Sequence, residues 1–112
     1  MNSKLKILDC TLRDGGYYND WKFSKKLFAK YLTAMEFSGV DIVELGFRFN
    51  NKNDRLGEFA YTSEDFLKNI SLPKNLDFAV MVNFKDFSKE EKKQSKELEK
   101  LFSQKKDSKI SI

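Results

Sequence analysis

The residues with the clearest chemical potential lie in one string, residues 9–16 (Asp-Cys-Thr-Leu-Arg-Asp-Gly-Gly). Arg13 offers a fork of charged N–H donors, and Asp14 offers hard carboxylate oxygens beside it. An adjacent pair of this kind suits a divalent cation together with an anionic oxygen, such as a carboxylate or an enolate. The same pair also suits a surface salt bridge beside a glycine turn, and the residue types alone leave both interpretations open.

The absence of histidine from all 112 residues restricts this chemistry more than any other count. It removes the commonest general base, the commonest transition-metal ligand and every histidine-containing triad. With one cysteine, Cys10, the chain also lacks the ligands of a self-contained zinc site. We expect Cys10 to be a small, buried, mid-strand residue rather than a nucleophile. Catalysis must then use Asp, Glu, Arg, Lys, Tyr or backbone groups, or residues outside these 112.

Composition predicts one soluble domain with neither a membrane nor a nucleic acid as partner. The chain is 40% hydrophobic and 34% charged, which suits one modest core. No apolar run approaches the roughly 20 residues of a membrane span, and the N-terminus has no signal-peptide pattern. Together with the lone cysteine, this predicts a cytoplasmic location. Residues 84–112 carry nine lysines against six acids, but their alternation with glutamates predicts a solvated helix face.

The apolar pattern predicts the elements that position the chemical residues. Strands are expected at residues 6–12, 40–47, 78–82 and, just begun, 109–112; helices are expected at 24–38, 63–70 and 89–104. Ser24 is the expected N-cap of the first helix, and Gly39 follows its end. Ser88 and Glu91 form an S-x-x-E pattern that is typical of a capping box. Strands that alternate with helices predict a parallel α/β fold.

Two architectures fit this order of elements: a small open doubly wound sheet, or the first part of an eight-stranded barrel. A flavodoxin-like sheet would need a fifth strand and a closing helix, and a (β/α)8 barrel needs about 250 residues. By either measure the chain ends early. We therefore expect residues 1–112 to be a truncated domain of about three βα units plus the start of strand four.

Residues 7–16 (Ile-Leu-Asp-Cys-Thr-Leu-Arg-Asp-Gly-Gly) resemble the opening strand of the DRE-TIM metallolyase superfamily. This superfamily includes 4-hydroxy-2-oxovalerate aldolases, 3-hydroxy-3-methylglutaryl-CoA lyase, isopropylmalate and homocitrate synthases, and pyruvate carboxyltransferase domains. Residues 15–21 (Gly-Gly-Tyr-Tyr-Asn-Asp-Trp), followed by residues 43–48 (Val-Glu-Leu-Gly-Phe-Arg), look most like its aldolase-type branch. The resemblance covers residues 6–112 and implies the N-terminal part of a TIM (β/α)8 barrel.

The resemblance implies roles for individual residues. Arg13 matches the arginine that stabilises the enolate oxygen, and Asp14 matches the aspartate that ligates Mg²⁺ or Mn²⁺. Glu44 matches an acidic residue of strand two that faces the site and helps to order it; a salt bridge to Arg13 or Arg48 is the alternative. The complete enzyme would cleave or form a carbon–carbon bond next to a 2-oxo acid, its small-molecule partner.

Two departures from the family pattern bear on activity. The aldolases carry an acid–base histidine three positions after the metal aspartate, where this chain has Tyr17. Tyr17 either exchanges protons with a lowered pKa or lines the substrate pocket. The family's other metal ligands, a His-x-His pair near strand seven, are not among these residues, so Asp14 alone leaves the metal site incomplete.

Two further residues are candidates for substrate binding. Arg48 begins a loop at the carboxyl end of the second strand, where it would meet an anionic substrate. Asn83 follows the third strand, where it either donates to a ligand or caps the strand end.

Two other classes of function are alternatives to the lyase interpretation. In one, the chain is a catalytically incomplete fragment whose open strand edges make it a self-associating homo-oligomer. In the other, it is a non-catalytic module that binds a small anion through Arg13 and the first loop. Binding of an oxo acid that depends on a divalent metal would separate the lyase from the anion-binding module.

Overall fold

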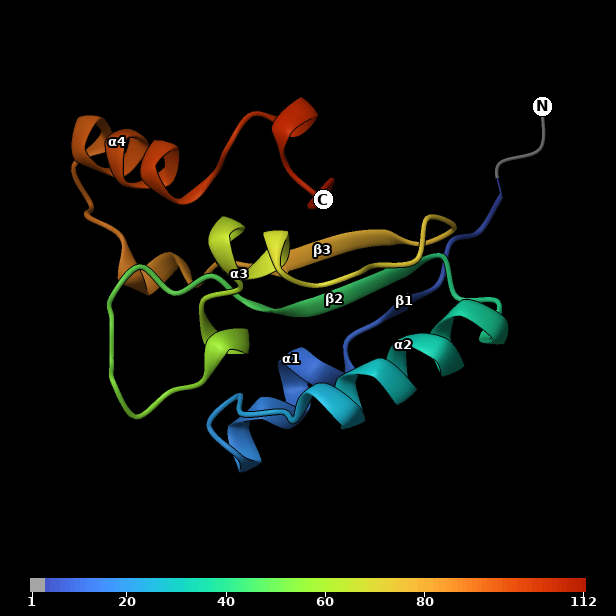
Figure 1. Cartoon of the computed structure of the whole chain (residues 1–112). Coiled ribbons are helices and arrows are strands. Elements are labelled where there is room, and N and C mark those ends of the chain that lie inside the picture. Colours follow the sequence, from blue (N-terminus) through green and yellow to red (C-terminus); the bar gives the residue numbers. More distant parts are fainter. Residues whose placement is uncertain (1–3) are drawn as a thin grey trace.

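The structure is a computed structural model and describes residues 4–112. Its sheet has three parallel strands in the order β1-β2-β3, namely β1 (Leu8–Asp9), β2 (Ile42–Phe47) and β3 (Asp77–Met81). Four helices connect and follow them: α1 (Thr11–Gly15), α2 (Lys25–Ser38), α3 (Glu64–Lys68) and α4 (Glu91–Leu101) (Figure 1). The predicted parallel α/β order is confirmed.

The last residues of the chain extend the sheet beside β3. The backbone N–H of Ile112 donates to the carbonyl of Phe78 at 3.3 Å, and the N–H of Val80 donates to the carbonyl of Ile112 at 3.3 Å. Ile112 thus bonds to two residues of β3, Phe78 and Val80, which flank Ala79. This pattern of hydrogen bonds is typical of parallel strands. The predicted start of a fourth strand is seen only as these hydrogen bonds, and the sheet of the described residues has three strands.

The first strand is shorter than the sequence predicts. Its ladder with β2 contains only Leu8 and Asp9, because the carbonyl of Cys10 accepts from the N–H of Asp14 at 2.9 Å and so starts a helix. Arg13 and Asp14 thus lie on α1, where a loop was expected, and not after a long strand. Cys10 is half-buried at the start of this helix, so its expected mid-strand burial is wrong.

The last helix also begins and ends inside the predicted limits. Its first residue is Glu91, and the expected capping box does not form. Instead, the Ser88 hydroxyl accepts from the N–H of Glu90 at 3.2 Å, and the N–H of Ser88 donates to the Glu97 carboxylate at 3.0 Å. Ser88 therefore closes a turn ahead of α4, and extended backbone at Phe102 ends the helix.

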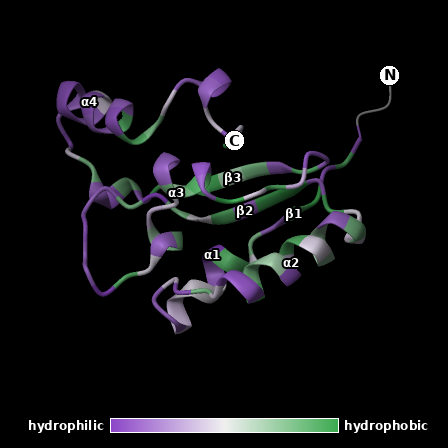
Figure 2. Cartoon of the chain, in the orientation of Figure 1, coloured by the Kyte–Doolittle hydropathy of each residue, from purple (hydrophilic) through white to green (hydrophobic). Residues whose placement is uncertain are grey.

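The core lies between the sheet and the helices α2 and α3. Val43 and Leu45 of β2 are fully buried and belong to one apolar cluster with Phe28 of α2 and Leu67 of α3. In Figure 2 the strands β2 and β3 are largely hydrophobic and α2 runs alongside the sheet, whereas α4 is largely hydrophilic. No residue of α4 is buried, as expected for a solvated helix. Within residues 4–112, no helix combines the length and hydropathy that crossing a bilayer requires.

We predict that Gly39→Ala will destabilise the protein by about 1 kcal/mol, because Gly39 ends α2 with a φ of 87° that side chains with a Cβ disfavour. Gly15→Ala is the matched control, since Gly15 has a helical φ of −67° and a Cβ there would meet no atom within 4 Å. Alanine at this control position should be neutral or slightly stabilising. Urea denaturation measures both; equal free energies of unfolding for the two variants would contradict the prediction.

Candidate functional site

Arg13, Asp14 and Glu44 meet at the edge of the sheet where β1 ends and α1 begins beside β2. The Nε of Arg13 donates to Oε1 of Glu44 at 2.7 Å, and Nη1 of Arg13 lies 3.7 Å from Oδ1 of Asp14. Ligands of open parallel sheets and barrels bind at this edge, because the strands direct their carboxyl ends there. The structure thus brings together three of the six residues that the sequence singled out.

Glu44 fixes Arg13 through one nitrogen and leaves two others available. The Glu44 side chain is 9% exposed and that of Arg13 is 20% exposed, so water competes only weakly for this bond. The hydrogen bond from Arg13 to Glu44 raises the pKa of Arg13, which keeps the guanidinium charged. Because the bond uses Nε, Nη1 and Nη2 remain able to donate to another acceptor.

A β-bulge helps to direct Glu44. Glu44 pairs with Ala79 and Gly46 pairs with Val80, so Leu45 is an extra residue in β2. Bulges of this kind change the local twist and re-aim the neighbouring side chains, often beside a site. The backbone of Gly46 also lies against the Phe59 carbonyl, which a Cβ would approach to 2.0 Å. Glycine at position 46 is therefore required for the loop after β2 to pack this closely.

Trp21 holds α1 from the other side. Its indole Nε1 donates to the Arg13 carbonyl at 2.9 Å, and only 6% of the residue is exposed. A Cβ on Gly16 would lie 1.9 Å from the indole, so only glycine leaves room for this packing. Asp20 and Trp21 adopt φ values of 57° and 55°, which non-glycine residues rarely do. Burial of the indole and its hydrogen bond offset this backbone strain.

Tyr17 is an exposed aromatic residue that shares one neighbour, Phe47, with Arg13. Its ring meets those of Trp21 and Phe47 edge to face, with centroids 4.8 and 6.0 Å apart, and 62% of the residue is exposed. The Arg13 guanidinium lies 6.0 Å from the Phe47 ring. This position suits a residue that lines a ligand site.

A second polar cluster, which the sequence analysis did not single out, holds the start of α1. The Asp9 carboxylate accepts hydrogen bonds from the Tyr31 hydroxyl and, at 3.1 Å each, from the N–H and hydroxyl of Thr11. Burial raises the pKa of Asp9, but these three bonds outweigh it and lower the pKa from its ordinary value of 3.8. Burial and the bond to Asp9 raise the pKa of Tyr31. The sequence gives little indication of this cluster, since the spacing of Tyr31 predicts only one residue of an apolar helix stripe.

We predict that Tyr31→Phe will lower the free energy of unfolding by about 1 kcal/mol at pH 6 and by less at pH 3. In the wild type, the lowered pKa of Asp9 stabilises the fold above about pH 4, and this contribution is lost as the pH falls through the folded-state pKa. Without the Tyr31 hydroxyl, burial brings the pKa of Asp9 up and the acid dependence shrinks. Urea titrations at both pH values, with Tyr18→Phe at a 95% exposed position as control, measure this. A difference that stays constant with pH would contradict it.

Arg48 is buried, and its guanidinium is hydrogen-bonded within the protein. The residue is 2% exposed, and its guanidinium donates to the Thr62 carbonyl at 3.0 Å, the Leu101 carbonyl at 2.9 Å and the Glu64 carboxylate at 3.1 Å. Burial lowers the pKa of Arg48, and the charge of Glu64 opposes this shift. These bonds give Arg48 a structural role, in which it joins the end of β2 to α3 and to the end of α4, and its contact with an anionic substrate stays a prediction.

Asn83 also has a local role. Its side-chain oxygen accepts from the N–H of Lys85 at 3.1 Å and caps the short 3₁₀ turn Phe84–Asp86. Of the two expected roles, this is the capping one. The amide nitrogen of the same side chain is still able to donate to a ligand.

The residues present do not fit a complete metal centre. In the part of the chain that the structure describes, no three residues of the types His, Cys, Asp and Glu are grouped closely enough to hold a metal ion. Asp14 is the only carboxylate assigned to a metal, and its side chain is 72% exposed. One carboxylate does not satisfy the six ligands that Mg²⁺ requires.

Comparison with known proteins places this geometry in context. No protein-family model matches the chain, and no curated protein matches it. A solved structure does, with 37% sequence identity and a TM-score of 0.66 over 88% of this chain. Its description is "Crystal structure of the N-terminal domain of a putative aldolase from Bacteroides vulgatus". The chain is similar to that N-terminal domain.

This similarity covers 33% of the solved chain, so the present chain spans about a third of the length of the protein it matches. It supports the coarser part of the sequence prediction, a small parallel α/β domain like the N-terminal domain of an aldolase. At 37% identity, it extends to the sequence as well as to the fold.

Proposed function

We propose that the protein takes part in aldolase chemistry and that Arg13 stabilises an enolate of a 2-oxo acid. The observation that carries this proposal is the 2.7 Å bond by which the buried Glu44 fixes Arg13 and leaves Nη1 and Nη2 for an oxyanion. The similarity to an aldolase N-terminal domain supports the reaction class. The finer assignment, to the aldolase-type branch of the DRE-TIM metallolyases, rests on the residues of 7–16 and 43–48.

The proposed reaction needs a positive charge beside the ketone oxygen of the substrate. In cleavage of a 4-hydroxy-2-oxo acid, a base removes the hydroxyl proton and an aldehyde leaves. The electron pair of the broken carbon–carbon bond becomes the enolate, whose negative charge lies largely on the former ketone oxygen. Nη1 and Nη2 of Arg13 would donate to that oxygen. A donor positioned in advance in this way contributes about 10²–10³ in rate.

The described residues offer a metal one exposed carboxylate, that of Asp14, which is too few ligands for a metal-dependent step. Asp14 would supply at most one ligand of the expected Mg²⁺ or Mn²⁺, and the others would come from outside residues 4–112. We likewise propose that the three parallel strands are the first part of a TIM barrel. The parallel pairing of Ile112 beside β3 supports this, because a barrel adds each new strand in the same direction.

The test is turnover by the protein as its native source makes it, with its intact mass measured on the same sample. We expect release of pyruvate from 4-hydroxy-2-oxopentanoate when Mg²⁺ or Mn²⁺ is added. Trp21 is the single tryptophan, and its indole is bonded to the Arg13 carbonyl, so pyruvate binding should also change its fluorescence. Metal-independent binding of pyruvate without turnover would favour the anion-binding module instead. If the protein neither binds pyruvate nor releases it, both the aldolase proposal and the anion-binding alternative are refuted.

A further inference from the structure

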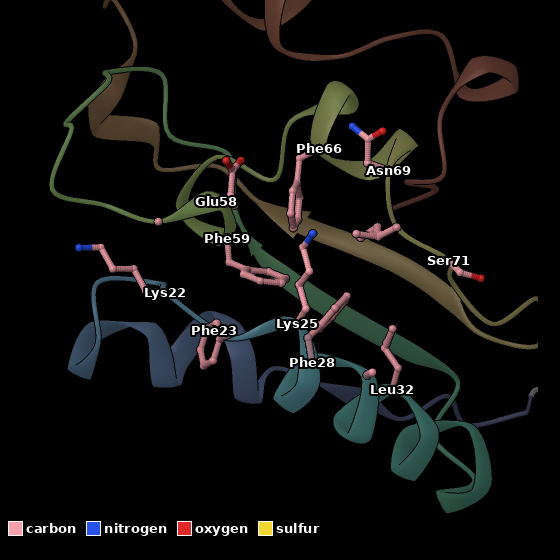
Figure 3. Close-up of a pocket in the computed structure, with 13 residues that line it drawn as sticks. Lys22, Phe23, Lys25, Phe28, Leu32, Glu58, Phe59, Phe66, Asn69 and Ser71 are labelled. Carbon is pink, nitrogen blue, oxygen red and sulfur yellow. The ribbon is translucent and has the colours of Figure 1, made fainter.

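A groove of about 490 Å³ lies between α2 and α3, away from the candidate site. Its floor is formed by Phe28, Leu32 and Phe59, which are between 3% and 6% exposed, and Phe66 stands at its upper side (Figure 3). This volume and this apolar lining are in the range of small-molecule sites. No residue assigned to the candidate site lines the groove, so it offers a separate place for a ligand.

The aromatic residues of the groove are arranged around Phe59. Its ring meets those of Phe23, Phe28 and Phe66 edge to face, with centroids 5.4, 4.9 and 5.2 Å away. Figure 3 shows these rings gathered around Phe59: Phe23 comes from the segment before α2, Phe28 from α2, Phe66 from α3, and Phe59 itself from the 3₁₀ helix Glu58–Ala60. Aromatic rings prefer such edge-to-face contacts, so a further ring supplied by a ligand would extend the same packing.

The charge at the mouth of the groove favours an anion. Lys25, the first residue of α2, extends across the mouth toward Phe66, whereas Lys22 and Glu58 point outward (Figure 3). Neither lysine forms a salt bridge with another residue in the described range 4–112. The net charge of these three side chains is +1.

The first turn of α2 strengthens this preference. Helices favour acidic residues there, because the helix dipole is positive at its N-terminus. In α2 the first turn contains no acidic residue and begins with Lys25 and Lys26. A bound anion would offset the repulsion between these lysines and the dipole. The fold thus leaves a net positive charge at the opening of an aromatic groove.

We infer that this groove binds an aromatic carboxylate, with its ring against Phe59 and its carboxylate beside Lys25. The inference goes beyond the proposed function, since it uses no residue of the aldolase site. It requires both parts of the ligand: the ring for the apolar floor, and the negative charge for the lysine and the helix N-terminus.

Isothermal titration of the protein with 2-naphthoate tests the inference, with the neutral 2-naphthalenemethanol and the cationic 2-naphthylmethylamine as matched probes. We expect one saturable site for naphthoate, an affinity for the alcohol about fivefold or more lower, and a still lower affinity for the amine. Equal affinities for naphthoate and the alcohol would show that Lys25 does not contribute to binding, and would overturn the inference. Absence of saturable naphthoate binding would overturn it as well.

Two variants locate the site. Lys25→Gln should reduce the affinity for naphthoate to that for the alcohol and leave the latter unchanged; Lys30→Gln, exposed on α2 but outside the groove, should change neither. Ala29→Phe places a ring in the groove from an exposed helix position and should abolish binding of both probes. Unchanged binding in Ala29→Phe would overturn the inference. A concentration-dependent mass that Ala29→Phe abolishes would do so too, by assigning the groove to a second copy of the chain.

Discussion

Arg13→Ala is expected to lower kcat for pyruvate release by about 10²–10³ and the free energy of unfolding by about 2 kcal/mol. The loss of rate follows from removing the donors proposed for the enolate oxygen. The loss of stability follows from Glu44, which is 7% exposed and would be left as a buried carboxylate without its 2.7 Å partner. Steady-state assays and urea denaturation of the same preparations measure the two effects.

A paired variant separates these two effects. Arg13→Met combined with Glu44→Leu removes both charges at once, so the double variant should regain most of the lost stability and remain inactive. Arg55→Ala is the control for a distant arginine, because its side chain is 70% exposed and 3.7 Å from Asp20. It should change neither quantity measurably. Wild-type kcat in Arg13→Ala would exclude the proposed role, whatever the stability.

Arg48→Met is expected to lower the free energy of unfolding by about 3 kcal/mol. This prediction does not depend on the proposed reaction. The substitution leaves the carbonyls of Thr62 and Leu101 without their donor and removes the cation from the Glu64 carboxylate. It also removes the contact between the guanidinium and the Phe102 ring, 4.8 Å away. Arg48→Lys should recover only part of this, since an ammonium group does not present donors in a planar fork.

Hydrogen exchange should show where the loss occurs. Because Arg48 donates a hydrogen bond to Leu101, the last residue of α4, the exchange rates of α4 amides should rise by a larger factor in Arg48→Met than those of β2 and β3. Arg55→Met, at an exposed position, is the matched control and should stay within about 0.5 kcal/mol of the wild type. An Arg48→Met protein as stable as this control would show that the three bonds contribute little.

Local patterns predicted most of the elements correctly. The almost continuous apolar run before Arg48 forms β2, and α2 begins after Ser24, whose hydroxyl accepts from the Leu27 N–H at 3.1 Å. Gly39 ends α2 in the left-handed conformation, as expected of a glycine that follows a helix. These features depend on neighbours within a few residues, so the chain sequence contains the necessary information. The capping pattern at Ser88 failed because Glu97, nine residues away, takes its N–H instead.

The sequence predicted which residues belong to the candidate site, but not which of them pair with one another. Arg13 and Glu44 were both singled out, yet the sequence allowed Glu44 to pair with Arg13 or with Arg48. The parallel register, with Asp9 opposite Val43, brings the chain after β1 beside Glu44 and decides for Arg13. The clusters of Asp9 with Tyr31 and of Arg13 with Trp21 were not foreseen, because their members lie 22 and 8 residues apart and carry no motif.

By itself, then, the sequence determined the parallel α/β class, the ends of α2 and the residues able to do chemistry, because each depends on local periodicity and side-chain type. Only the tertiary structure decided which charges meet. Glu44 lies against Arg13, whereas Arg48, four residues further along the chain, turns to Glu64 and Leu101 and becomes a buried brace. Strand pairing and burial make that choice, since a charge removed from water must find its partner wherever the fold places one.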